Sequence, residues 1–210
     1  MRAVYNYLVV EVDGYLIERV RGSELYAPDQ AYRPSAALVD VGVVAAPCPG
    51  YRMESLSGAY DGCFVPSRRK AWFRYTNNAP ENRFTHGGKR YLRVRASQVY
   101  AYEGNHGDIL AAPGYTLLRD DPGGDPYEGA QPSGLWLPDA SRDEGAGRHR
   151  VLEIADVGEG ALDGLYVRSG DIAYVRPGGL YDVYDGAAKY YVSADRNVTA
   201  VRQIAETEES

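Results

Sequence analysis

Ser133-Gly134-Leu135-Trp136-Leu137-Pro138-Asp139 is a run of three consecutive apolar residues enclosed by glycine and proline. The residues around it, 120–132 and 141–150, are polar, rich in Gly, Pro and Asp, and lack helix or strand periodicity. Segments of such composition do not form a packed core. We therefore expect a long loop whose triplet, Leu135, Trp136 and Leu137, binds a partner.

The same pattern occurs earlier in the chain, as Ser23-Glu24-Leu25-Tyr26-Ala27-Pro28-Asp29. Both copies read Ser-x-Leu-aromatic-x-Pro-Asp, and the second follows the first by 110 residues, from Ser23 to Ser133. One such match is weak evidence, because a few fixed positions in a proline-rich loop recur by chance. The case for a repeat therefore depends on the flanking sequence.

The flanks also pair between the two halves of the chain. The paired segments are residues 4–12 with 109–118, Asp40-Val41-Gly42 with Asp156-Val157-Gly158, Lys89-Arg90-Tyr91-Leu92 with Lys189-Tyr190-Tyr191-Val192, and Gln98-Val99 with Asn197-Val198. Residues 75–89 have no clear counterpart. The order of these matches predicts two divergent copies of one unit of about a hundred residues.

The composition favours short strands over helices. The chain contains 19 Tyr but only 3 Phe and 2 Met, and Tyr and Val at alternating positions suit half-buried strands. Its 24 Gly and 12 Pro indicate many turns, for example after a strand expected at Cys63-Phe64-Val65. Short strands separated by such turns predict an all-β fold, and the repeat predicts two barrels.

Charge and cysteine usage exclude some classes of protein. The net charge of −6 argues against a nucleic-acid partner. Cys48 and Cys63 show no metal-ligand spacing, and we expect them to be reduced thiols. The N-terminus has no signal-peptide core, and no apolar run reaches membrane-spanning length. These features predict a soluble, cytoplasmic protein that does not bind membranes.

Four segments of the second unit carry a family resemblance through their order. They are Gly134-Leu135-Trp136-Leu137, Val151-Leu152-Glu153-Ile154-Ala155-Asp156-Val157-Gly158, Val167-Arg168-Ser169-Gly170-Asp171-Ile172 and Val198-Thr199-Ala200-Val201. This unit resembles the GroES-type 10 kDa co-chaperonin family over residues 109–204. The first unit departs from the family pattern, because Ala27 stands where the third large apolar residue of the loop is expected.

The resemblance implies an all-β fold of two GroES-like irregular β-barrels in tandem. Residues 1–104 would form the first, divergent barrel, residues 105–205 the second barrel, and residues 206–210 an acidic tail. It also implies a co-chaperonin without catalytic activity, cofactor or metal, which caps a chaperonin ring. Leu135, Trp136 and Leu137 would dock on the apical domains of the chaperonin, with Leu25 and Tyr26 as a weaker second contact.

The linker of six residues from Glu103 to Asp108 is too short to separate the two barrels widely. The apolar outer segments, residues 4–10 and 198–204, would remain open to neighbouring chains. We therefore expect a closed cyclic homo-oligomer, with three or four chains giving an even number of barrels.

Two other functions fit parts of the sequence. An oligomeric structural or assembly protein, for example one associated with a viral capsid, would keep the barrels without the chaperonin. A nucleic-acid-binding module would use the basic and aromatic residues from Arg68 to Tyr75. Catalysis has less support, because His86, His106 and His149 are isolated and no nucleophile motif or dinucleotide-binding turn is present.

Overall fold

The computed structural model describes residues 2–4, 6–14, 39–54, 59–120, 149–162, 166–176 and 179–204. These residues form strands β1 to β15 and short 3-10 turns. The prediction of an all-β protein is confirmed. The strands form two large sheets and one separate hairpin.

The first large sheet is built mainly from residues 7–103. Its strands are β1 (Tyr7–Val12), β2 (Val39–Ala46), β5 (Lys70–Arg74), β6 (Arg83–His86), β7 (Lys89–Arg95), β8 (Val99–Glu103) and β9 (Ile109–Ala111). They lie in the order β6-β7-β1-β2-β5-β8-β9, and every neighbouring pair is antiparallel. The sheet is therefore an antiparallel sheet with β6 and β9 at its ends. β1 is paired on both sides, so the expectation that residues 4–10 remain an open edge was wrong.

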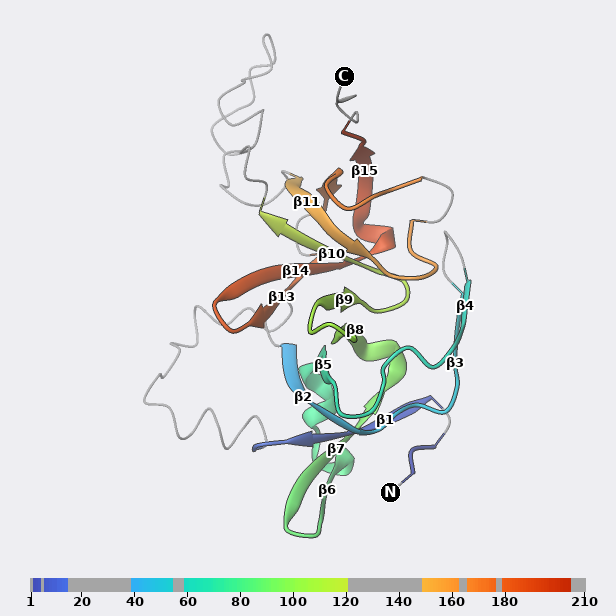
Figure 1. Ribbon diagram of the computed structural model, residues 1–210, viewed down its shortest axis with the longest axis vertical. Coiled ribbons are helices and arrows are strands. Elements are labelled where there is room, and N and C mark those ends of the chain that lie inside the picture. The colour runs from blue at the N-terminus through green and yellow to red at the C-terminus, as the bar shows by residue number, and fades with distance from the viewer. Residues whose placement is uncertain are drawn as a thin grey trace, which may run out of the picture.

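The second large sheet follows the same plan. Its strands are β10 (Tyr115–Asp120), β11 (Arg150–Val157), β12 (Ile172–Val175), β13 (Leu180–Asp185), β14 (Ala188–Ala194) and β15 (Val198–Arg202). Their order is β13-β14-β10-β11-β12-β15. Taken in this sheet order, these strands occupy the places of β6, β7, β1, β2, β5 and β8, so the two halves of the chain share one topology. The two sheets stack along the long axis of the molecule (Figure 1).

Register shifts between paired strands also occur at corresponding places in the two sheets. The pairing of β1 with β2 shifts register between Val9 and Val10, and that of β10 with β11 shifts between Leu117 and Leu118. The pairing of β5 with β8 shifts after Trp72, and that of β12 with β15 shifts after Tyr174. Bulges mark fixed places in a sheet. They therefore define which residues of the two halves correspond.

This register corrects two of the sequence pairings. Val10 pairs with Val44, and Leu118 pairs with Ile154, so residue 44 corresponds to residue 154. Asp40-Val41-Gly42 therefore lies near the start of β2, whereas Asp156-Val157-Gly158 lies at the end of β11, and matching them was wrong. The Lys89 and Lys189 segments are displaced by one residue, because Val10 pairs with Leu92 while Leu118 pairs with Tyr191.

Two further expectations about the first half were wrong. Residues 75–89 do have a counterpart, because β6 forms a hairpin with β7 as β13 does with β14. The two-residue turn at Gly87-Gly88 corresponds to the one at Gly186-Ala187. Cys63-Phe64-Val65 is not a strand: β4 (Ala59–Gly62) ends before it, after pairing with β3 (Tyr51–Glu54) in a separate hairpin.

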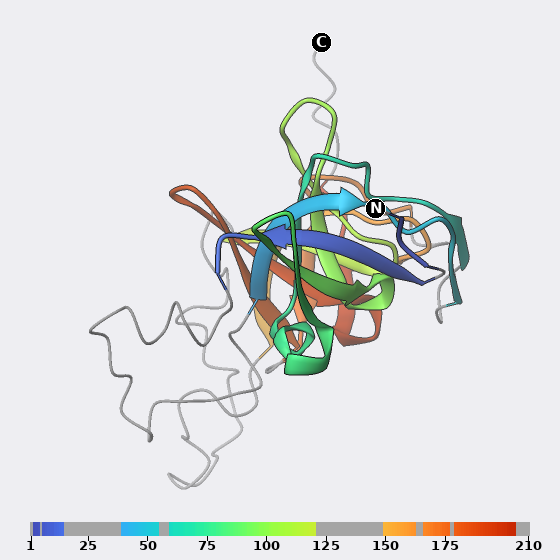
Figure 2. The ribbon, with the colours of Figure 1, turned by 90° about the horizontal axis from the view of Figure 1, so that it is seen from below.

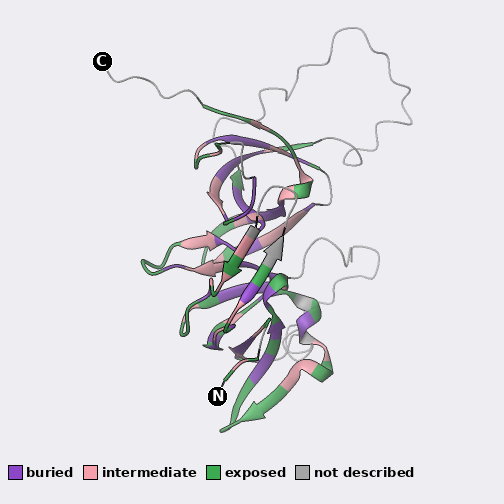
Figure 3. Cartoon of the chain, turned by 90° about the vertical axis from the view of Figure 1, so that its right-hand side faces the viewer, coloured by how far each residue is buried: buried purple, intermediate pink, exposed green. Residues whose placement is uncertain are grey.

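Each sheet covers a core on one of its faces. Alternation along β1 directs Leu8, Val10 and Val12 into the first core. Leu118, at the place of Val10, lies in the second core with Leu152 and Ile154. Buried segments run through both sheets and through the level where they meet (Figure 3). The two halves therefore have separate cores.

A third apolar cluster joins the halves, and we call it the inter-half joint. It consists of Trp72, Tyr100, Ala101, Ala111, Leu117, Val183 and Val192. The indole Nε1 of Trp72 donates to the carbonyl oxygen of Tyr184 at 2.9 Å, and the ring of Tyr100 stacks on that of Tyr181 at 4.3 Å. An aromatic cluster with a satisfied indole N–H makes a firm contact. Viewed along the long axis, the strands of the first half overlie those of the second (Figure 2).

Candidate functional site: the bases of the two long loops

The five residues expected to contact a chaperonin, Leu25, Tyr26, Leu135, Trp136 and Leu137, lie outside the described residues. The structure does describe the strands from which both loops leave and to which they return. The first loop connects β1 to β2, and the second connects β10 to β11. In Figure 1 the ends of β1 and β10 lie on the same side of the molecule. Both loops therefore start from equivalent places on one side of the fold.

A polar network joins the two ends of the second loop. Arg150, the first residue of β11, donates from Nη2 to Oδ1 of Asp120 at 3.0 Å and to the hydroxyl of Tyr191 at 2.7 Å. That hydroxyl donates to Oδ2 of Asp120 at 3.3 Å. The guanidinium of Arg150 also lies over the ring of Tyr191, 4.1 Å from its centre. The network therefore fixes the residues at both ends of this loop.

Further charged residues lie at the base of the second loop. The Nζ of Lys189 lies 4.7 Å from the centre of the Tyr191 ring and 3.0 Å from Oδ2 of Asp182. The hydrogen bond to Asp182 is the largest cause that raises the pKa of Lys189. Arg119 pairs with Glu153, whose side chain is largely buried. Charge pairs at exposed sites contribute little to stability individually.

The base of the first loop has different chemistry. By the strand register, Val12, Asp40 and Leu92 stand at the places of Asp120, Arg150 and Tyr191. Asp40 is buried, and its Oδ1 accepts the backbone N–H of Val41 at 2.9 Å. Contacts at this base include a Glu11–Lys89 pair at 2.7 Å and a hydrogen bond from Arg90 to the Asp13 carbonyl oxygen at 3.4 Å. The Asp–Arg–Tyr network is therefore particular to the second loop.

A small groove opens between this first base and the second half. Its volume is about 290 Å³, and its lining includes Glu11, Asp13, Val41, Val43, Trp72 and Tyr184. The Nζ of Lys70 crosses the groove to Oδ1 of Asp185 at 3.0 Å. The groove is thus an open part of the junction between the halves, with apolar walls and acidic edges.

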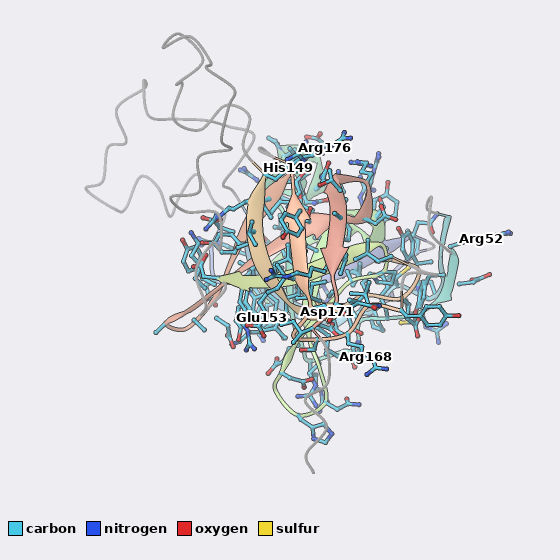
Figure 4. All side chains as sticks on the ribbon, turned by 90° about the horizontal axis from the view of Figure 1, so that it is seen from above. Arg52, His149, Glu153, Arg168, Asp171 and Arg176 are labelled. Atoms are coloured by element: carbon cyan, nitrogen blue, oxygen red, sulfur yellow. The ribbon has the colours of Figure 1, made fainter. Side chains whose placement is uncertain are left out.

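The Gly-Asp-Ile segment of the family resemblance has a structural role here. Asp171 is buried, its Oδ2 accepts the backbone N–H of Arg168 at 2.9 Å, and its Oδ1 accepts that of Ile204 at 3.0 Å. Arg168 and Asp171 lie close together, as this hydrogen bond requires and as Figure 4 shows. This carboxylate ties the turn before β12 to the segment after β15.

The comparisons with known proteins identify no family. Neither the protein-family models nor the curated proteins include a match to this chain. The case for a function therefore depends on the residues and the fold.

Most of the residues that could bind nucleic acid are buried or make contacts within the protein. Trp72 and Phe73 are buried, so neither ring is available to stack on a base. Arg69 donates to the carbonyl oxygen of Asn105 at 3.3 Å, and Lys70 pairs with Asp185. Within the Arg68–Tyr75 segment, Trp72 and Lys70 contact the second half, and Phe73 packs in the first core.

The structure shows no other chemical centre in the ranges that it describes. Those ranges hold no group of three His, Cys, Asp or Glu side chains suited to a metal ion, and no helix able to cross a membrane. Cys48 and Cys63 are both free, and burial, together with Cys48, raises the pKa of the Cys63 thiol. A raised pKa keeps a thiol in its unreactive protonated form.

Sequence reasoning did not find the Asp120, Arg150 and Tyr191 network. The available signal was the presence of opposite charges on the two residues that bound a long loop. Tyr191 could not be added from sequence, because its place beside Arg150 depends on β14 pairing with β10.

Tyrosines near the junction make stability depend on pH. Burial is the main cause that raises the pKa of Tyr115 to about 12, and neighbouring Tyr181 and Tyr51 add to it. Burial also raises the pKa of Tyr100. In the unfolded chain a tyrosine loses its proton near pH 10. The folded state therefore holds these protons more tightly than the unfolded state does.

We expect the free energy of unfolding to fall as pH rises from about 10 to about 12, because the unfolded chain ionises first. Tyr115→Phe removes one ionisable group and should make this fall shallower. Urea unfolding at several alkaline pH values, followed by circular dichroism, measures it. Equal slopes for the parent and the variant would show that Tyr115 does not contribute.

Proposed function

We propose that this protein is a co-chaperonin of two GroES-like irregular β-barrels, which caps a chaperonin ring through the hydrophobic triplets of its two long loops. It assists protein folding in this way and has no catalytic activity of its own. Leu135, Trp136 and Leu137 form the main contact with the apical domains of the chaperonin. Leu25 and Tyr26 form a second, weaker contact.

The observation that carries the proposal is the shared topology of the two halves. Both sheets have the same strand order and the same bulges, and both place the loop with the repeated apolar motif between corresponding strands. One loop motif in a polar segment would be weak support. Two such motifs at equivalent places on one side of the fold favour a common binding role.

The strength of each contact suits a partner that must bind and release. Burying a Leu or Trp side chain contributes roughly 1.5–3 kcal/mol. Ordering a loop on binding costs about 2–5 kcal/mol, so a single loop binds weakly. Several loops displayed by one assembly bind together through avidity. The network at Asp120, Arg150 and Tyr191 supports the second loop as the stronger contact, because it holds together the two residues that flank that loop.

Display of several loops requires assembly of several chains. We propose a closed cyclic homo-oligomer with an even number of barrels, formed by three or four chains. Heterologous contacts between identical chains generate such rings when the rotation closes.

The test is a pull-down of the full chain with a chaperonin, with and without nucleotide. Binding that depends on nucleotide is the expected result. Absence of binding in both conditions would contradict the proposal.

The exposed apolar side chains of Val41, Val43 and Phe84 also favour a second candidate, an oligomeric assembly protein that keeps the barrels but binds no chaperonin. The same experiment separates the two functions. An assembled particle that ignores the chaperonin supports this second candidate.

A further inference from the structure

Both cysteines of the chain lie at the base of one hairpin. Strands β3 and β4 pair only with each other among the described strands, in a sheet separate from the two large ones. Cys48 lies three residues before β3, and Cys63 follows β4 directly. In Figure 1 this hairpin lies at one side of the molecule. The two thiols therefore lie where the chain enters and leaves the hairpin.

The register of the hairpin places the two cysteines on one face. Extended by one residue past its last pair, the ladder sets Gly50 opposite Cys63, and extended by three residues it sets Cys48 opposite Val65. Residues two apart on a strand share a face, and so do residues directly opposite each other. Cys48 and Cys63 are therefore diagonal neighbours on the same face.

Each thiol leans toward the other along its own segment. The Sγ of Cys48 donates at 3.0 Å to the carbonyl oxygen of Gly50, the residue opposite Cys63. The Sγ of Cys63 donates at 3.8 Å to the carbonyl oxygen of Val65, the residue opposite Cys48. Diagonal neighbours lie about 7–8 Å apart and a disulfide spans about 4.4–6.8 Å between Cα atoms, so bonding needs a shift of about 1 Å. Because both cysteines lie outside the paired residues of the hairpin, this shift breaks none of its pairs.

The two thiols differ in their access to solvent. Cys63 is exposed, whereas Cys48 is buried in the first core beside Tyr51 and Val65. Burial is the main cause that raises the pKa of the Cys63 thiol, and Cys48 is the next. The effect of one charge on another falls off with distance, so this influence agrees with the register in placing the two sulfurs near each other. A dissolved oxidant reaches Cys63 first, and Cys48 then reacts with its neighbour.

We propose that Cys48 and Cys63 are a redox-modification site, which a small-molecule disulfide such as oxidised glutathione converts to an intramolecular disulfide at the base of the β3–β4 hairpin. First, the Cys63 thiol loses its proton and its sulfur attacks one sulfur of oxidised glutathione. This step forms a mixed disulfide and releases one glutathione thiolate, which takes up a proton. The Cys48 sulfur, after losing its proton, then attacks the Cys63 sulfur and releases the second glutathione. The protein loses two electrons and two protons, and the oxidant becomes two glutathione thiols.

The bond fastens a hairpin that aromatic contacts hold in place. Tyr51, Tyr60 and Phe64 pack against one another, and Phe64 also packs against Tyr102 of β8, with ring centres 5.7 Å apart. A disulfide from residue 48 to residue 63 closes a loop around the whole hairpin, and such a closure limits how far the chain opens. Oxidation therefore stabilises the hairpin. This site goes beyond the proposed function and does not depend on it.

Incubation of the full chain with oxidised glutathione at about pH 8.5 tests the bond, because the thiolate is the attacking form and free cysteine ionises near that pH. We expect a chain lighter by two hydrogen atoms. A tryptic digest made without reductant should contain peptides 22–52 and 53–68 joined together, and dithiothreitol should separate them. The parent chain gives this result by itself, so the test does not require a variant to fold.

Two variants test the order of the steps. Cys48→Ala removes the buried thiol, so the reaction should stop with one glutathione on Cys63. Cys63→Ser removes the exposed thiol, so the folded variant should take up no glutathione. Circular dichroism confirms that both variants are folded before the oxidant is added.

Limited cleavage by trypsin tests the effect on the hairpin. Arg52 projects from the edge of the molecule on β3, and cleavage after it requires the hairpin to open locally (Figure 4). We expect the oxidised chain to be cut there at least about tenfold more slowly than the reduced chain. Lys89, on the β6–β7 hairpin, is the matched control, and cleavage after it should not change on oxidation.

Four results would overturn the proposal. A parent chain that stops at one glutathione, or a dimer joined through Cys63 on a non-reducing gel, would show that the two thiols do not reach each other. Uptake of glutathione by Cys63→Ser as fast as by the parent would show that Cys48 is not shielded. Equal cleavage after Arg52 before and after oxidation would show that the bond does not hold the hairpin.

Discussion

Replacing Leu135 and Leu137 together by serine should abolish detectable chaperonin binding while leaving the fold unchanged. Each leucine contributes roughly 1.5–3 kcal/mol when it is buried in an apolar groove. Losing both corresponds to about 3–6 kcal/mol, or a loss of roughly 10²–10⁴-fold in affinity per loop. The loss is larger in an assembly, because avidity multiplies the contribution of each loop.

The measurement is a pull-down or titration against a chaperonin, with nucleotide present. Circular dichroism and sedimentation velocity on the variant establish that the barrels and their assembly are intact. The matched control is Leu25→Ser with Tyr26→Ser, which makes equivalent changes in the first loop. We expect this control to bind more weakly than the parent but far better than the second-loop variant.

Equal binding by the second-loop variant and the parent would contradict the co-chaperonin proposal at its main contact. Equal losses from both loop variants would contradict only the ranking of the two loops. The ranking depends on Ala27, which replaces a large apolar residue in the first triplet, and on the network at Asp120, Arg150 and Tyr191.

The sequence was sufficient for the fold class and for most strands of the second half. The segments 151–158 and 198–201, which carry the family resemblance, contain β11 and β15, and residues 189–192 lie within β14. Period-two alternation and Gly or Pro turns are local signals, so they can be read without tertiary contacts. The pairing of Val99 with Val198 also agrees with the strand register.

The wrong matches between the two halves involve residues whose correspondence depends on strand pairing. The Asp-Val-Gly match was three residues long, and a slip of a strand changes which residues face the core. The β6 strand was missed because Arg83, Phe84, Thr85 and His86 carry few core side chains. The five loop residues of the candidate site lie outside the described residues, so their role remains a prediction.

The inter-half joint could not be predicted from sequence at all. Trp72, in a basic and aromatic segment, was assigned to a possible nucleic-acid surface. Its burial depends on strands more than a hundred residues away, as the bond from its indole to the Tyr184 carbonyl shows. Segments far apart in sequence meet there, and local patterns do not encode such a meeting.

Trp72→Ala should therefore be the most destabilising single change at the junction. Truncating a buried Trp typically costs about 3–5 kcal/mol, through lost apolar contact and the cavity that it leaves. It also leaves the Tyr184 carbonyl without its indole donor, although this group lies near solvent at the hairpin. The cost should fall on the joint, because Phe73 and the first core lie on the other face of β5.

Urea unfolding followed by far-ultraviolet circular dichroism measures this effect. Tyr174→Ala is the matched control, because Tyr174 has the same place in the second sheet but faces outward, and we expect it to cost less than about 1 kcal/mol. Separate transitions for the two halves of Trp72→Ala would show that the joint couples two independent cores. A cost for Trp72→Ala as small as that of the control would mean that the halves are held together by the β8–β9 pairing and not by the aromatic cluster.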